Sequence, residues 1–309
     1  MLSYSIGFIF VRCHLQKRVS LADGAEALPI GRTGFKGEIY DVRALLGAAG
    51  FDFTRDHLED TLKNFGDTGQ CALYRPLPIE ANSFIEAIER CEHAAAAAAG
   101  ALAVISANPA LAFCAYAKHP KDSGVKFFIP NDRKIFHGTN VAGYLDALPA
   151  IEERARADSK FFALLRLYQA SLREREVDHQ LLFQLILLEE VSDDETGTLA
   201  ERLRSFAQRH GITGDFDIVA KDCGLELPPG NDMVDVLIKL RNSAAHNGRI
   251  DETSLREFNG DWVLPLLGNK AALHKAVSEA IRYMFCALVG HTRDKMATLV
   301  TGQLSIRFD

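Results

Sequence analysis

The chain has 309 residues, of which 48% are hydrophobic and 25% are charged. A chain of this length and composition can form two domains and bury a sizeable core, which excludes a disordered protein. The formal net charge of -6 argues against broad, sequence-independent attraction to nucleic acid, because such binding needs an excess of Lys and Arg. Any RNA site must therefore gather its few cations in one local cleft, which two chains can share.

The first part of the chain contains short apolar runs of strand length. They cover residues 4–11, 72–74, 111–116 and 125–129. Pro130, Asn131 and Asp132 favour a turn after the last run. The first run has no basic residues before it, so it is interpreted as a strand rather than a signal peptide.

Helical spacing appears between these runs. Leu58, Leu62 and Phe65 predict a helix that is capped by Thr54 and ended by Gly66. A longer helix is expected over residues 80–105, where the alanine run is too weakly hydrophobic for a membrane span and favours a buried helix. Residues 1–147 are therefore expected to form an α+β domain with a sensing or docking role.

The strand pattern disappears after residue 147. Apolar side chains at helical spacing predict helices over residues 161–172, 181–191, 199–206, 233–244 and 270–288. Asn231 or Asp232 is expected to cap the fourth of these helices, and Asn247 with Gly248 to end it. Residues 148–309 are therefore expected to form an all-α helical bundle, so the fold class is α+β followed by all-α.

The cysteines are scattered and form no C-x-x-C pair or zinc-ligand pattern. They are expected to be free and mostly buried thiols, which favours a reducing cytoplasm as the location. Neither a metal nor a cofactor is expected, because no known phosphate-binding, metal-binding or dinucleotide-binding motif is present. The six cysteines are Cys13, Cys71, Cys91, Cys114, Cys223 and Cys286.

The most informative segment, residues 237–251, reads LIKLRNSAAHNGRID. On a helix, Asn242 and His246 are four residues apart and share a face. Arg241 lies about 140° around the helix and about 7.5 Å along it from His246. These side chains can therefore line one cleft only from its two sides.

RNA cleavage without a metal needs a base for the 2′-hydroxyl proton and a cation for the charge on the phosphate. Histidine exchanges protons near neutral pH, so His246 suits the first role. Arg241 suits the second, because its planar fork can bind phosphate oxygens in pairs. Asn242 can orient either group, and Arg249 and Arg204 are weaker candidates for contacts with the RNA backbone.

This segment resembles the HEPN superfamily, whose signature is Arg, a polar residue such as Asn, and His after four to six intervening residues. Four residues separate Arg241 from His246 here, and the helices that precede the motif also look similar. The resemblance covers residues 150–295. It implies that Arg241 and His246 are catalytic, that Asn242 supports them, and that two copies pair through the motif helix into one cleft.

The resemblance leaves two functions open. Family members include toxins, defence effectors and RNA-processing nucleases that cut RNA without metal, whereas others are catalytically silent binding modules or scaffolds. The expected partners are RNA as substrate, a second copy of the chain and a regulatory protein, with no membrane. The first hypothesis is a metal-independent endoribonuclease in a defence or toxin system, and the alternative is a non-catalytic binding or scaffold protein.

The spacing alone is weak, since Arg173 with His179 and Arg204 with His210 repeat it with one more residue. Those histidines are expected at the surface or in packing contacts. An Arg and a His at a helix end often only cap carbonyl groups. Glu189 and Glu190 are expected to pair with arginines of the bundle rather than to act as an acid pair.

Overall fold

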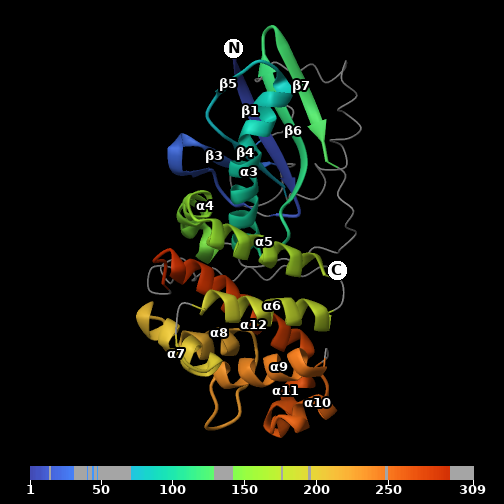
Figure 1. The fold of residues 1–309 in the computed structure, drawn as a ribbon, viewed down its shortest axis with the longest axis vertical. Coiled ribbons are helices and arrows are strands. Elements are labelled where there is room, and N and C mark those ends of the chain that lie inside the picture. Colours follow the sequence, from blue (N-terminus) through green and yellow to red (C-terminus); the bar gives the residue numbers. More distant parts are fainter. Residues whose placement is uncertain are drawn as a thin grey trace. The chain divides into compact units, whose positions relative to one another are not determined.

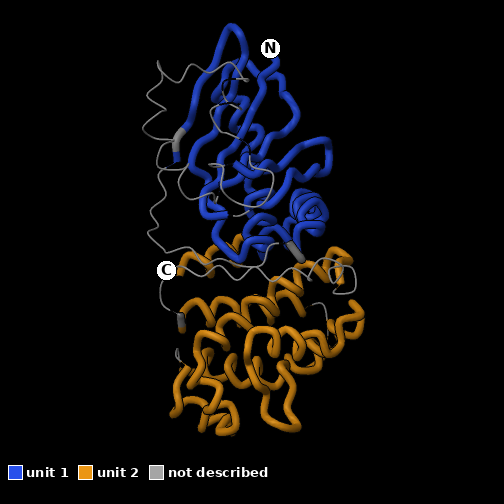
Figure 2. Tube along the Cα trace, turned by 180° about the vertical axis from the view of Figure 1, so that it is seen from behind, with its two compact units in different colours: residues 1–165 blue, residues 166–309 orange. Residues whose placement is uncertain are grey.

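The computed structural model describes residues 1–13, 15–30, 40, 44, 47, 71–128, 142–174, 177–193, 196–247 and 250–292. It divides into unit 1, Met1–Leu165, and unit 2, Arg166–Asp309, which Figure 2 colours separately. The division falls after the boundary expected at residue 147, because helix α4 (Leu148–Ala157) packs against α3 (Phe84–Ser106) of unit 1. An antiparallel sheet followed by a helical region agrees with the predicted order of structure.

Unit 1 is built on one antiparallel sheet (Figure 1). Its strands follow the order β2-β3-β4-β1-β6-β7, and β5 pairs with the start of β1. The long strand β1 is central because it pairs with both β4 and β6, and a register shift interrupts its pairing with β6 between Ile9 and Phe10. The strands are β1 (Leu2–Val11), β2 (Val19–Ser20), β3 (Glu26–Ile30), β4 (Cys71–Arg75), β5 (Ile79–Ala81), β6 (Leu111–His119) and β7 (Asp122–Phe127).

The four predicted strands correspond to β1, β4, β6 and β7. Their apolar residues meet in a core that includes Ile9, Leu73 and Cys114. The helix expected between Thr54 and Gly66 and the turn expected at residues 130–132 lie outside the described residues.

Helix α3 packs against β1 and β6 and is buried along most of its length, as the alanine run predicts. It begins later than predicted, because the side chain of Ser83 caps it by accepting a hydrogen bond from the backbone N–H of Glu86 at 3.2 Å. Glu80 and Ala81, which were expected in the helix, instead pair with Ser3 and Leu2 of β1. Among the described residues, no helix has both the length and the apolar character of a membrane span.

Unit 2 is helical in its described part. Helix α12 has the predicted bounds, and α6, α7 and α9 correspond to the other predicted helices of this unit. The short helices α8, α10 and α11 lie in segments where no helix was predicted. The helices are α5 (Ser159–Arg173), which begins in unit 1, then α6 (Val177–Val191), α7 (Leu199–Arg209), α8 (Asp215–Asp222), α9 (Met233–Asn247), α10 (Glu252–Glu257), α11 (Leu264–Leu267) and α12 (Lys270–Leu288).

Candidate functional site

Helix α9 carries the motif and packs against α6, α7, α8 and α10. Its apolar stripe is buried, with Leu237, Leu240 and Ala244 each at most 2% exposed. At its start, the side chain of Asp232 accepts a hydrogen bond from the backbone N–H of Asp235 at 2.8 Å, as its predicted role as cap requires. Helix α9 is described as far as Asn247, and Gly248, the second residue of the predicted stop, lies outside the described residues.

Arg241 is held by a carboxylate of a neighbouring helix. Its Nε and Nη2 atoms lie 3.1 and 2.8 Å from Oε2 of Glu189 in α6, and Nη2 also donates to Oε1 at 3.1 Å. This two-point contact fixes the plane of the guanidinium group, which a single hydrogen bond cannot do. The side chain of Arg241 is still 30% exposed, and its Nη1 donates to Oδ1 of Asn242 at 3.4 Å.

A second arginine reaches the same carboxylate from α7. Nη2 of Arg202 lies 3.5 Å from Oε1 of Glu189, and its Nη1 lies 3.4 Å from Oδ1 of Asp193. The Nε atom of Arg202 is buried without a hydrogen-bond partner in the described structure. The prediction that Glu189 pairs with arginines is therefore confirmed, whereas Glu190 is exposed.

His246 lies near the C-terminal end of α9 and is exposed. Its ring packs against that of Phe258, with 4.9 Å between the ring centroids and 31° between the planes. Phe258 is in turn held by its carbonyl oxygen, which accepts a hydrogen bond from Nζ of Lys239 at 2.7 Å. Within the described structure, the nitrogen atoms of the His246 ring make no hydrogen bond, so they are available to a ligand.

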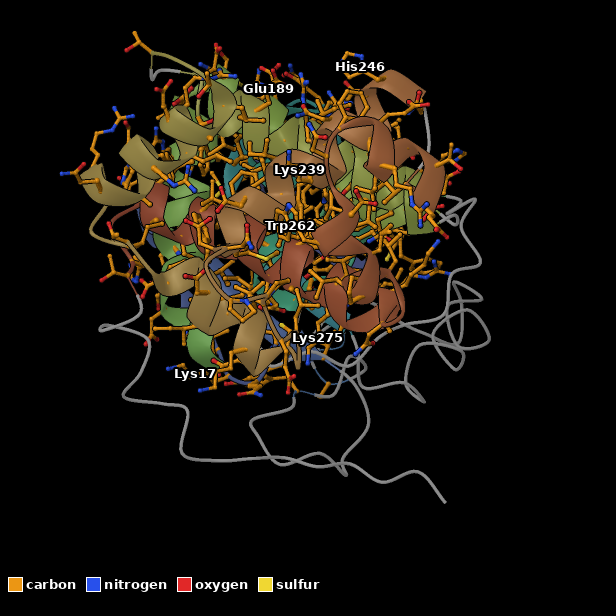
Figure 3. All side chains as sticks on the ribbon, turned by 90° about the horizontal axis from the view of Figure 1, so that it is seen from below. Lys17, Glu189, Lys239, His246, Trp262 and Lys275 are labelled. Carbon is orange, nitrogen blue, oxygen red and sulfur yellow. The ribbon has the colours of Figure 1, made fainter. Side chains whose placement is uncertain are left out.

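Arg241 and His246 therefore contact different neighbours in one chain. Arg241 is directed to Glu189 of α6, and His246 to Phe258, which follows α10. Figure 3 shows Glu189 and His246 at separate positions along the rim of the helices. No hydrogen bond between the guanidinium and the imidazole is present in the described structure. Within one chain, these two side chains are therefore directed to different neighbours and do not contact each other.

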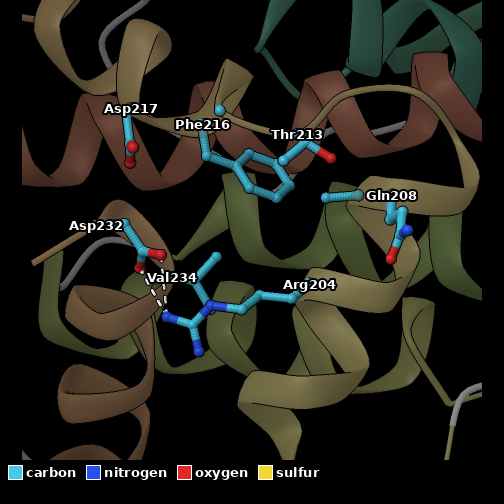
Figure 4. A pocket seen from close by; sticks show the side chains of 9 residues that line it. Arg204, Gln208, Thr213, Phe216, Asp217, Asp232 and Val234 are labelled. Carbon is cyan, nitrogen blue, oxygen red and sulfur yellow. Dashed lines mark hydrogen bonds and ion pairs between the residues drawn. The ribbon is translucent and has the colours of Figure 1, made fainter.

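Arg204 lies away from this cluster, near the start of α9. Its Nη2 donates to Asp232 at 3.0 Å and to Asp235 at 2.7 Å. These hydrogen bonds raise the pKa of Arg204, and the bond to Asp235 has the larger effect. Figure 4 shows Arg204 at the side of a cavity of about 340 Å³, with Phe216 and Asp217 also among the lining residues. Two carboxylates surround this one cation, so Arg204 is a poor phosphate contact, and Arg249 lies outside the described residues.

The two other histidines with a similar spacing have the simple roles expected of them. His210 packs on Phe206, with 4.4 Å between the ring centroids, and His179 is exposed on α6. The ring contact of His210 is similar to that of His246 with Phe258, so ring packing alone does not distinguish His246.

None of the six cysteines forms a disulfide, and five of them are buried. Burial raises the pKa of Cys114 and of Cys286 to about 12 in each case, so these thiols stay protonated at neutral pH. In the described part of the chain, no group of three His, Cys, Asp or Glu side chains could hold a metal ion.

Comparisons of the chain with protein-family models, with curated proteins and with solved structures found no match. The side chains of α6, α7 and α9 therefore provide the evidence on function. One residue of the site geometry, Phe258, was missed as a site residue, and nothing in the sequence distinguished it. Arg202 belongs to the basic run of α7 with Arg204 and Arg209, which the sequence indicated only as a weak candidate for contact with the RNA backbone.

Proposed function

We propose that unit 2 is a metal-independent endoribonuclease of the HEPN type, with its site at the C-terminal half of α9. The observation that carries the proposal is the contrast between two side chains of this helix. Arg241 is held as an oriented cation by Glu189 and remains 30% exposed. His246 is exposed, with ring nitrogens that make no hydrogen bond in the described structure. One group is fixed to bind a phosphate, and the other is accessible to exchange a proton.

In this proposal the 2′-hydroxyl oxygen of the RNA attacks the adjacent phosphorus while His246 accepts the hydroxyl proton. The bond from phosphorus to the 5′-oxygen breaks, the leaving oxygen takes up a proton from water, and His246 returns its proton to the solvent. The products are a 2′,3′-cyclic phosphate and a free 5′-hydroxyl. Arg241 binds the phosphate oxygens, whose charge grows in the transition state, and Asn242 orients the guanidinium group through its 3.4 Å contact.

The proposal includes a second copy of the chain. Because Arg241 and His246 contact different neighbours, a two-fold pairing of the motif ends of α9 supplies a cleft with the motif residues of both copies. It also gathers cations locally, which a chain with a net charge of -6 needs in order to bind RNA. The resemblance to HEPN domains supports the same pairing.

One observation favours the alternative, a catalytically silent binding or scaffold protein of the same kind. Glu189 occupies two of the three nitrogen atoms of the Arg241 guanidinium group, and the third, Nη1, already donates one hydrogen bond to Asn242. Only the second N–H of Nη1 and the outer face are left for a phosphate. If Glu189 competes with phosphate instead of orienting Arg241, the site binds a partner without cleaving it.

The purified protein is expected to cut a labelled single-stranded RNA in the presence of EDTA and to leave 2′,3′-cyclic phosphate ends. Arg241→Ala is expected to lower the cleavage rate by about 10²- to 10³-fold, because it removes the donor to the charged phosphate. Arg256→Ala, at an exposed arginine of α10, serves as the control and should cut at the wild-type rate. Intact RNA with the wild-type protein would exclude the nuclease and leave the silent binding module.

A further inference from the structure

The carboxylate of Glu189 contacts two guanidinium groups, and one of them, that of Arg202, lies outside the motif. Arg241 contacts both of its oxygens, and Arg202 contacts Oε1 at 3.5 Å. The two cations come from α9 and α7, and the carboxylate between them comes from α6. We refer to Arg202, Glu189 and Arg241 as the arginine–glutamate cluster.

The two arginines of this cluster differ in freedom. Arg202 is only 14% exposed, and its Nε atom is buried without a partner in the described structure. Arg241 is 30% exposed and lies at the surface beside Asn242. Without the carboxylate, two like charges would face each other, and Arg241 is the one with room to move away.

We infer that Glu189 is a positioning residue for the proposed cleavage, holding Arg241 in the orientation that contacts phosphate, and that Arg202 is the fixed second cation of the same surface. This inference rests on the proposed function. A carboxylate that is shared by two arginines neutralises neither of them fully. In this inference Glu189 therefore orients Arg241 for a phosphate and does not compete with the phosphate for it. Asp193, the other carboxylate near Arg202, is 61% exposed, so solvent screens its charge more strongly.

Glu189→Gln separates positioning from charge. The substitution raises the local charge by one unit and weakens the two-point contact with Arg241. RNA binding should therefore become about fivefold tighter near 0.1 M salt, as expected for one additional cation facing single-stranded nucleic acid. The cleavage rate at saturating RNA should fall about 10- to 100-fold, since a misplaced phosphate donor loses transition-state contacts. A purely structural role would weaken binding and cleavage together.

The neighbouring Glu190 provides a charge-matched control. It lies next to Glu189 in the same helix and is exposed, so Glu190→Gln makes the same change in net charge without touching the cluster. This control should keep the wild-type cleavage rate at saturation. Glu189→Asp retains the charge on a shorter side chain, so it should bind RNA as the wild type does and cleave more slowly.

Binding is measured by fluorescence anisotropy with a 2′-O-methyl RNA, which lacks the attacking hydroxyl, and cleavage by single-turnover assays with the unmodified RNA in EDTA. Tighter binding with slower cleavage for Glu189→Gln, and unchanged cleavage for Glu190→Gln, supports the inference. If the wild type cuts RNA and Glu189→Gln cuts equally fast, the positioning role is wrong while the nuclease stands. If the wild type does not cut RNA, both fail.

Discussion

Replacing His246 with Ala is expected to slow RNA cleavage by about 10²- to 10⁴-fold, the usual contribution of a general base. RNA binding should change little, because the proposed role of His246 is to accept a proton and Arg241 is the group that binds the phosphate. The substitution removes an exposed ring that contacts Phe258, so the free energy of unfolding should change by only about 0.5 kcal/mol. Single-turnover assays measure the effect on cleavage. Urea denaturation, followed by the fluorescence of Trp262 in unit 2, measures the effect on the free energy of unfolding.

His179→Ala is the matched control for this experiment. His179 is exposed on α6 of the same unit and follows Arg173 at nearly the same spacing, yet it has no proposed role. This variant should cut RNA as the wild type does. If His246→Ala cleaves RNA at the wild-type rate, His246 is not the base, whatever the effect of Arg241→Ala.

Glu152→Gln is expected to stabilise unit 1 by up to about 3 kcal/mol at pH 8 and to have little effect at pH 4.5. The Glu152 side chain is fully buried in α4, and its oxygens make no hydrogen bond in the described structure. Burial raises its pKa from the ordinary 4.5 to about 7, against the opposing effect of Arg156, whose Nη1 lies 3.7 Å from Oε1. The nearby carboxylate of Asp23, which is paired with Arg156, raises the pKa further.

The sign of this effect follows from proton binding. The folded protein holds the proton of Glu152 more tightly than the unfolded chain does, so its contribution to stability is complete below pH 4.5. That contribution is lost as the pH rises towards 7 and does not change further above it. Thermal denaturation between pH 5 and 8, followed by circular dichroism, should show a smaller pH dependence for Glu152→Gln than for the wild type. Glu153→Gln, at an exposed neighbour, should behave as the wild type, and equal pH dependence of all three proteins would contradict the account.

The longer helices of unit 2 could be predicted because their signals are local, whereas the short helices α8, α10 and α11 were missed. The bounds of α12 follow from one apolar stripe, and the start of α9 follows from Asp232 as a cap. The buried alanine run of α3 also follows from composition, since it is too weakly hydrophobic for a membrane span and has few polar groups to solvate.

The strands that were missed depend on distant partners. Strand β3 contains Pro29, which weakens its local signal, yet its residues pair with β4 from Glu26↔Arg75 to Ile30↔Cys71. Glu80 continues a helical pattern in the sequence, but β1 takes it into β5 as a partner of Ser3. Such pairings join residues that are far apart in the chain, and no local pattern specifies them.

Of the candidate site, only the motif on α9 could be predicted from the sequence. The spacing of Arg241, Asn242 and His246 places them on one helix, and the structure confirms that helix. The sequence also predicted that Glu189 pairs with an arginine, but it gave no means to choose among the many arginines of the bundle. The contact with Arg241 spans 52 residues and depends on how α6 packs against α9.

In the proposed mechanism two copies of α9 build one RNA-cleaving site, and a mixture of two inactive variants shows whether the copies share it. Arg241→Ala and His246→Ala are co-expressed with different tags, and the mixed dimer is isolated by both tags and assayed with labelled RNA in EDTA. In the mixed dimer, each copy supplies the group that the other lacks, so cleavage should rise at least tenfold above that of either variant alone, on the order of one restored catalytic contact. A mixed dimer that is as inactive as its parents, or a chain that stays monomeric when it binds RNA, would contradict a site shared between two copies.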